Sequence, residues 1–249
     1  MASAEVWHLV LGVSALVGIA VAVLGTARVP VCWAPATAVA RGALQLALVA
    51  LVLHQAITDA RLVAAALTVM FVVATLTASR RLGGGVRRTV TVAGATGVGV
   101  VVALGVVFAT GALAATARYV LALGGIVIGN AMTFATLTGR RFTGAVVDRW
   151  DEIEGWLALG ATPAQATRQI ARESVRSALI PNLDQTRTTG LVTLPGAFVG
   201  AIFGGVSPLE AGRFQIVVLA AVLAAGSVTG VLLLRWSPPT TQRPSPPPG

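Results

Sequence analysis

Long apolar stretches recur along this chain, and they limit its fold more than any other feature of the sequence. A helix of about 20 apolar residues crosses a hydrocarbon core of about 30 Å. Only 11% of the residues are charged, and a stretch such as Val98–Ala109 shows no polar face at the helical period, which argues against a soluble helical bundle. The sequence therefore predicts an all-α polytopic membrane protein of about seven transmembrane helices, with one long amphipathic cytoplasmic connection. The predicted spans are Val6–Gly25, Ala36–Leu53, Leu62–Ala78, Thr89–Ala112, Tyr119–Thr138, Thr188–Val206 and Phe214–Leu234.

The arginines alternate between connections in a way that predicts the topology. Every second connection is rich in arginine, and the intervening ones hold only Arg61, Arg118 and Arg213. Because cytoplasmic loops carry the excess of positive charge, we expect the amino terminus outside the cell membrane and the carboxyl terminus in the cytoplasm. The first span lacks a basic region before it, so we expect it to be retained. This topology accounts for the net charge of +9 without a nucleic-acid partner.

The chain contains no lysine, so it cannot hold a phosphate-binding loop of the G-x-x-x-x-G-K-[ST] type. All nine acidic residues lie outside the predicted spans or at their ends, which disfavours an ion-coupled carrier that buries a carboxylate. We expect no catalytic residues, because no nucleophile and base share one membrane depth. ATP and magnesium are therefore expected on a partner ATPase, with no cofactor bound by this chain.

Metal ligands of the usual kind are sparse. The only histidines, His8 and His54, are isolated toward the outer ends of two predicted spans, where interfacial anchoring is the default interpretation. The single cysteine, Cys32, has no disulfide partner within the chain. The sequence leaves a metal site undetermined.

The residues Ala164–Ile180 have the pattern of an amphipathic helix. Arg168, Arg172 and Arg176 recur every four residues on one side, while small and apolar residues gather on the other. One interpretation is a helix in the inner headgroup layer, with its arginines toward lipid phosphates. The other is a coupling element that contacts a cytoplasmic motor protein.

A charged, turn-forming segment precedes this helix. Asp148, Asp151 and Glu152 are predicted to share a helix face, Gly160 can supply the backbone angle of a tight turn, and Thr162 can cap the following helix. The segment resembles the cytoplasmic EAA loop of ABC-transporter permeases, which docks into a cleft on the nucleotide-binding subunit. By this resemblance, coupling to the ATPase is assigned to Glu152, Glu154, Leu159, Gly160, Ala161, Thr162, Gln165, Arg168 and Arg172.

Several blocks of the chain resemble the FetB family of ABC permeases. Members of that family pair with a separate ATPase and are implicated in iron export, and plant relatives are linked to aluminium tolerance. The resemblance implies a permease homodimer, served by two copies of a cytoplasmic ATPase, that exports iron or another metal ion or complex. The blocks run in family order and are Ala40–Leu46, Gly125–Met132, Leu157–Gln165, Arg172–Pro181, Gly190–Gly196 and Phe214–Val218.

Polar residues at mid-membrane depth suggest a transport path. Asn130 lies about 17 Å along its predicted span, near the bilayer midplane, and Gln45 lies at a similar depth in another span. The alternative role for Asn130 is an interhelical hydrogen bond. Pro195 lacks an amide donor and marks a hinge or a lining segment. The predicted path residues are Gln45, Asn130, Thr133, Thr193, Pro195 and Gly196.

These observations predict one permease domain at 1–236, with a coupling segment at about 140–187. The proline-rich segment 237–249 is expected to be disordered or extended. The alternative class is an ATPase-independent secondary carrier or a membrane scaffold. A neighbouring reading frame that encodes a Walker-motif protein would favour the ABC permease.

Overall fold

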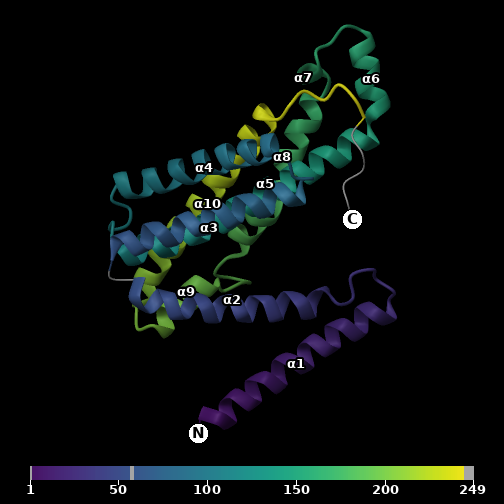
Figure 1. Ribbon diagram of the computed structural model, residues 1–249. Coiled ribbons are helices and arrows are strands. Elements are labelled where there is room, and N and C mark those ends of the chain that lie inside the picture. Colours follow the sequence, from purple (N-terminus) through teal and green to yellow (C-terminus); the bar gives the residue numbers. More distant parts are fainter. Residues whose placement is uncertain (1, 57–58, 244–249) are drawn as a thin grey trace. The chain divides into compact units, whose positions relative to one another are not determined.

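A computed structural model describes residues 2–56 and 59–243, with the side chains of 2–5, 48 and 51–56 outside the description. Within that part of the chain the regular structure is entirely helical, apart from one isolated bridge between Thr189 and Thr193 (Figure 1). The all-α prediction is therefore confirmed. The helices are α1 (Ala2–Thr26), α2 (Ala34–Ala56), α3 (Ala60–Arg81), α4 (Val86–Ala109), α5 (Ala117–Asp148), α6 (Trp150–Ala158), α7 (Pro163–Ala166), α8 (Arg168–Thr188), α9 (Gly196–Phe203) and α10 (Pro208–Trp236).

Among the described residues, five helices are long and apolar enough to cross a membrane, and the predicted count of seven is not confirmed. These candidate spans lie in α1, α3, α4, α5 and α10. Helix α2 covers the predicted span Ala36–Leu53 but is not among the five, and it carries Arg41 and Gln45. The description of α2 leaves out several side chains at its carboxyl-terminal end.

The predicted continuous span Thr188–Val206 is wrong, because the helix is interrupted inside it. Helix α8 ends at Thr188, a non-helical segment runs from Thr189 to Pro195, and α9 has only eight residues. Eight helical residues rise about 12 Å, which is less than half of a hydrocarbon core. Pro195, which the sequence marked as a hinge, ends this break at the amino-terminal cap of α9.

The chain divides into two compact units, residues 1–58 and 59–249. In the first unit, α1 and α2 pack as a helical pair joined by residues 27–33. The window of α1 that qualifies as a span has no buried residue in the structure. Such an uncovered apolar surface is expected of a helix that faces lipid.

In the second unit, α3, α4, α5 and α10 pack around one apolar core. Leu123, Val127 and Phe134 of α5 are almost completely buried there, together with Val100 of α4 and Val222 of α10. Helices α4 and α10 approach closely at Gly99, where an added Cβ would lie 2.6 Å from the backbone oxygen of Ala225. Close approach over a small residue increases dispersion contacts, which take the place of the hydrophobic effect between helices in lipid.

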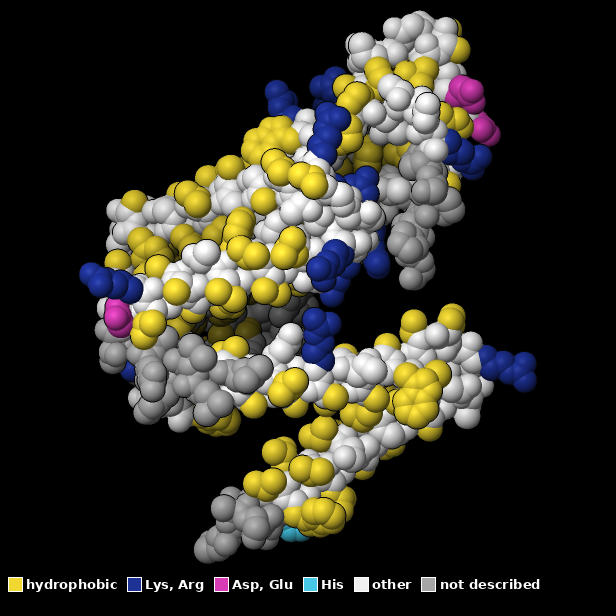
Figure 2. Space-filling model, in the orientation of Figure 1, with side chains coloured by type: hydrophobic (Ala, Val, Ile, Leu, Met, Phe, Trp, Pro, Cys, Tyr) yellow, Lys and Arg dark blue, Asp and Glu magenta, His cyan; other side chains and the backbone are white. Residues whose placement is uncertain are grey.

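The two ends of this bundle differ in charge. At one end, a cavity of about 520 Å³ is lined by the α3–α4 connection, by α5 near Phe142 and by the end of α10, so these arginine-rich parts lie together. At the other end, the Tyr119 hydroxyl donates to a Glu210 carboxylate oxygen at 3.4 Å. Figure 2 shows Arg side chains gathered at the end of the bundle that carries α6, α7 and α8. The arginine-rich connections of the second unit thus lie at one end of its bundle. The orientation of that end across the membrane stays a prediction.

Cysteine labelling tests that orientation. In a Cys32→Ser background, Ala115→Cys should react with a membrane-impermeant thiol reagent in intact cells, and Val86→Cys should react only after the membrane is opened. Val86 suits the test because it is 83% exposed, whereas Gly84 has a φ of +69° that would strain a cysteine. The reverse labelling pattern would place the arginine-rich end outside and would contradict the predicted topology.

Candidate functional site

Helix α5 continues well past its predicted end at Thr138 and carries an arm away from the bundle, which we call the coupling arm (residues 149–167). The helix breaks at Arg149, whose φ and ψ of −110° and 29° lie outside the helical region. Asp148 therefore belongs to α5, while Asp151 and Glu152 belong to the first turn of α6. The prediction that these three acids share one helix face is wrong, because sequence spacing does not reveal the break between α5 and α6.

The coupling arm rests on a small apolar cluster of its own. Val146, Ile153 and Ile170 are buried at its centre with Ala166, and Trp150 packs against them. These residues come from α5, α6, α7 and α8. Burial of one large aliphatic side chain contributes about 1.5 to 3 kcal/mol, so the cluster fixes the arm to the ends of both long helices.

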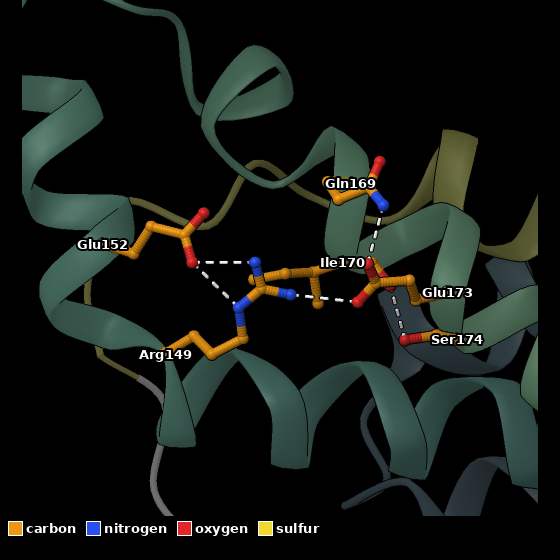
Figure 3. A network of polar contacts seen from close by, with 6 residues as sticks. All are labelled: Arg149, Glu152, Gln169, Ile170, Glu173 and Ser174. Atoms are coloured by element: carbon orange, nitrogen blue, oxygen red, sulfur yellow. Dashed lines mark hydrogen bonds and ion pairs between the residues drawn. The ribbon is translucent and has the colours of Figure 1, made fainter.

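An ion-pair network closes the side of this cluster (Figure 3). The Arg149 guanidinium donates from Nε and Nη2 to Oε2 of Glu152 at 2.8 and 2.7 Å, and from Nη1 to Oε2 of Glu173 at 2.9 Å. Gln169 Nε2 donates to the other Glu173 oxygen at 2.6 Å. Hydrogen bonding to Glu152, aided by the negative charges of both carboxylates, raises the pKa of Arg149 above its ordinary value. The network joins α6 to α8 across the end of α5.

The tip of the arm is a turn with defined caps on both sides. Gly160 has a φ of 87°, its amide donates to Leu157 O at 3.0 Å, and the Ala161 amide donates to Trp156 O at 3.0 Å. These two bonds form a Schellman motif. Thr162 and Gln165 then form a capping box, in which each side chain accepts a hydrogen bond from the other residue's amide. The structural roles predicted for Gly160 and Thr162 are confirmed.

This capped tip presents apolar surface outward. Leu159 is 83% exposed and Trp156 is 52% exposed. Glu154, Ala158 and Gly160 beside them are also exposed. Outside the membrane, an apolar side chain held at the end of a rigid arm is typical of a protein contact. The predicted coupling residues are therefore brought onto the arm and the start of α8, although their role in coupling stays a prediction.

The amphipathic helix predicted at Ala164–Ile180 exists, with two differences. It is divided at Thr167 into α7 and α8, and α8 continues through Pro181 to Thr188. Ile170, Ser174 and Ala178 are buried on its inner side. Arg168, Arg172 and Arg176 are exposed on the other side, as the pattern predicted.

Of the predicted path residues, Asn130 and Thr133 lie together on α5. Asn130 is half-buried, and its Nδ2 donates to Ile126 O at 2.9 Å within the same helix. Thr133 is exposed and donates to Gly129 O at 3.2 Å. Among the described residues, Asn130 makes no hydrogen bond to another helix, so the interhelical alternative finds no partner there. Within the described residues of the second unit, the side chains of Asn130 and Thr133 thus bond only within α5.

The remaining path residues lie in other segments. Thr193 is exposed in the non-helical segment before α9, and its backbone oxygen accepts from the Gly190 amide at 2.9 Å. Pro195 caps α9 and Gly196 begins it. Gln45 is exposed on α2 in the first unit. Within the second unit, no hydrogen bond joins Asn130 or Thr133 to residues 193–196 in the described part of the chain.

Metal-binding groups are not concentrated in the described residues. No group of three His, Cys, Asp or Glu residues there lies close enough to hold a metal ion. His8 is exposed on α1, and the side chain of His54 lies outside the described residues. The identity of a metal ligand set therefore stays undetermined.

Sequence reasoning missed two polar features. Arg149 and Glu173 are 24 positions apart, so no helical spacing could pair them. Gln215 of α10 is only 6% exposed, and its Oε1 has no hydrogen-bond partner within the described residues. A glutamine inside the apolar run Phe214–Val218 was the available signal for the second, since a buried amide usually has a partner.

Comparison with known proteins places the chain among membrane proteins. Residues 6–240 match the family model described as uncharacterised protein family UPF0014. UPF0014 membrane protein STAR2 of Oryza sativa subsp. japonica is 44% identical over 117 residues, 47% of this chain and 41% of that protein. Protein ALUMINUM SENSITIVE 3 of Arabidopsis thaliana is 41% identical over 116 residues, 47% of this chain and 42% of that protein.

A bacterial relative carries a functional name. The probable iron export permease protein FetB of Escherichia coli (strain K12) is 38% identical over 113 residues, 45% of this chain and 44% of that protein. The matched regions thus span less than half the length of each of these relatives. No solved structure matches the chain. The resemblance read from the sequence is confirmed at the level of the family.

Loss of the Arg149 network should loosen the coupling arm without unfolding the bundle. In Arg149→Met, amide hydrogen exchange at 150–167 should become faster, because α6 loses its link to α8 while the apolar cluster remains. Arg187→Met is the matched control, since Arg187 pairs only with Asp184 among the described residues, at 3.4 Å on an exposed surface. Unchanged exchange in the arm of Arg149→Met would contradict a positioning role for Arg149.

Proposed function

The chain belongs to the UPF0014 family of membrane proteins, and from this premise we propose that it is the membrane-spanning permease subunit of an ABC transporter. ATP hydrolysis takes place in a separate cytoplasmic ATPase. The arginine-rich end of the bundle faces that ATPase, which puts the amino terminus outside and the carboxyl terminus in the cytoplasm of the cell membrane. Like other permeases of this kind, the chain works as a homodimer with two ATPase copies.

The coupling arm is the observation that carries this proposal. Its tip exposes Leu159 and Trp156 on a capped turn, and its base is fixed to α5 and α8 by the apolar cluster and by Arg149. A push on such an arm moves the two long helices rather than bending a loop, because packed interiors resist continuous deformation. Nucleotide-driven closure of an ATPase dimer would reach the membrane in this way.

The proposed cargo is iron or another metal ion or complex, moved outward. A relative is named a probable iron export permease, and that name supports the cargo class here. The polar face of α5 at Asn130 and Thr133, with Thr193, Pro195 and Gly196, forms the path. Asn130 Oδ1 supplies a neutral oxygen, which suits transient contact with a cation or its bound ligands.

An ATPase-independent carrier or a membrane scaffold is the alternative function. Neither function requires an apolar tip on a rigid arm outside the membrane. A scaffold would also tolerate substitutions on the polar face of α5. The two experiments below therefore separate these alternatives from the proposed permease.

Gly160→Arg tests the contact between the arm and the ATPase. The variant should insert in the membrane and fold, but ATP hydrolysis by the co-purified ATPase should lose its response to the permease, because bulk and charge block docking. Gly160→Ala is the matched control: a Cβ at Gly160 meets no atom within 4 Å, so alanine adds only backbone strain of roughly 1 kcal/mol. Full stimulation by Gly160→Arg would refute docking at this turn.

Asn130→Leu tests the path. Cells that carry this variant with its ATPase should retain iron, measured by elemental analysis, as cells without the system do. The intrahelical bond of Asn130 contributes less than about 1 kcal/mol, so yield and melting temperature should stay close to those of the wild type. Thr136→Val is the matched control, because Thr136 makes the same kind of bond to Met132 O on a buried face of α5. Undiminished export by Asn130→Leu would exclude a necessary role for Asn130.

A further inference from the structure

A groove of about 990 Å³ runs between α8 and α10 and is closed on one side by residues 237–240. We call it the arginine groove, because Arg168, Arg172 and Arg176 of α8 and Arg235 of α10 line it. All four arginines are exposed. None of them forms an ion pair or a side-chain hydrogen bond among the described residues, where the recorded ion pairs involve only Arg149 and Arg187.

No acidic side chain in the lining therefore neutralises the positive charge of the groove. Its lining contains four arginines and no aspartate or glutamate. Like charges that share one cavity repel each other, and an anion between them removes that repulsion. Arginine also matches the planar geometry of a phosphate group through paired N–H donors.

Apart from Thr167, Ser237 and Thr240, the rest of the lining is apolar, which is unsuited to a small soluble anion. Leu179 and Leu183 of α8 and Val231 and Leu234 of α10 line the groove together with the arginines. From Arg176 to Leu183, α8 rises about 10 Å, and from Val231 to Arg235, α10 rises about 6 Å. The groove thus leads from a cationic rim at the end of α10 to an apolar floor along the two helices.

The position of the rim matches the surface of a bilayer. Arg235 and the 45% exposed Trp236 end the candidate span in α10, and tryptophan and arginine are typical of the membrane interface. A volume near 990 Å³ is at the upper end of ordinary ligand pockets, which leaves room for a headgroup and the first part of its acyl chains.

We propose that the arginine groove binds an anionic glycerophospholipid, with its phosphate at the four arginines and its acyl chains along Leu179, Leu183 and Val231. The lipid holds the arginine side of α8 against α10, next to the base of the coupling arm. This inference rests on the membrane embedding of the bundle and not on an ATPase partner, so it stands or falls separately from the proposed function.

Native mass spectrometry of the full-length protein in mild detergent tests the proposal. With equal amounts of phosphatidylglycerol and phosphatidylcholine, the wild type should retain phosphatidylglycerol preferentially. Arg176→Gln with Arg235→Gln, two positions outside the predicted coupling set, should weaken that retention by about fivefold for each arginine removed. Arg80→Gln with Arg81→Gln is the matched control, because both arginines are exposed at the same end of the bundle and neither lines the groove.

Each further outcome decides the question. Equal retention of both lipids, an equal loss in the control variant, or displacement of the lipid by excess inorganic phosphate would overturn the proposal. Should the double glutamine variant fail to fold, Arg176→Lys with Arg235→Lys keeps the charge and should retain the lipid, whereas each single glutamine variant should lose about fivefold. Loss of the lipid in the lysine variant, together with full retention in the single glutamine variants, would equally overturn the proposal.

Discussion

The uninterrupted backbone hydrogen bonding of α5 is the feature on which the rest of the second unit depends. In a hydrocarbon core each backbone amide and carbonyl needs a partner inside the protein, and a continuous helix supplies all of them. Helix α5 keeps this ladder for 32 residues, from Ala117 to Asp148, and packs against α3, α4, α8 and α10. Its last turns lie beyond the predicted span, so one rigid rod joins the membrane core to the coupling arm.

The segment after α8, by contrast, has no continuous helical ladder of backbone hydrogen bonds. Residues 189–195 carry non-helical backbone, and Leu191 and Val192 there are 93% and 78% exposed. Irregular backbone within a membrane is tolerated only where protein or water satisfies its polar groups. Helix α5 is continuous, whereas the chain after α8 is not helical until α9. Movement of α8 relative to α5 would therefore reorganise the segment at Thr193 and Pro195. Helix α8 belongs to the proposed lever, and the path residues Thr193 and Pro195 follow directly after its end.

Local patterns in the sequence predicted much of this structure. The Gly160 turn, the Thr162 cap and the buried side of α8 follow from residue types within a few positions of each other, and all three were predicted. The Arg149 contact to Glu173 and the close approach at Gly99 depend on residues that meet only in the folded chain.

Photocrosslinking at position 159 tests the central claim, that the coupling arm is the docking point for a separate ATPase. With a photoreactive amino acid in place of Leu159, illumination of cells should yield an adduct with a polypeptide that contains an ATP-binding Walker motif. The same residue in place of Leu209, which is 70% exposed in the first turn of α10, should yield no such adduct. Absence of a protein adduct at 159, or the same adduct at both positions, would contradict the account.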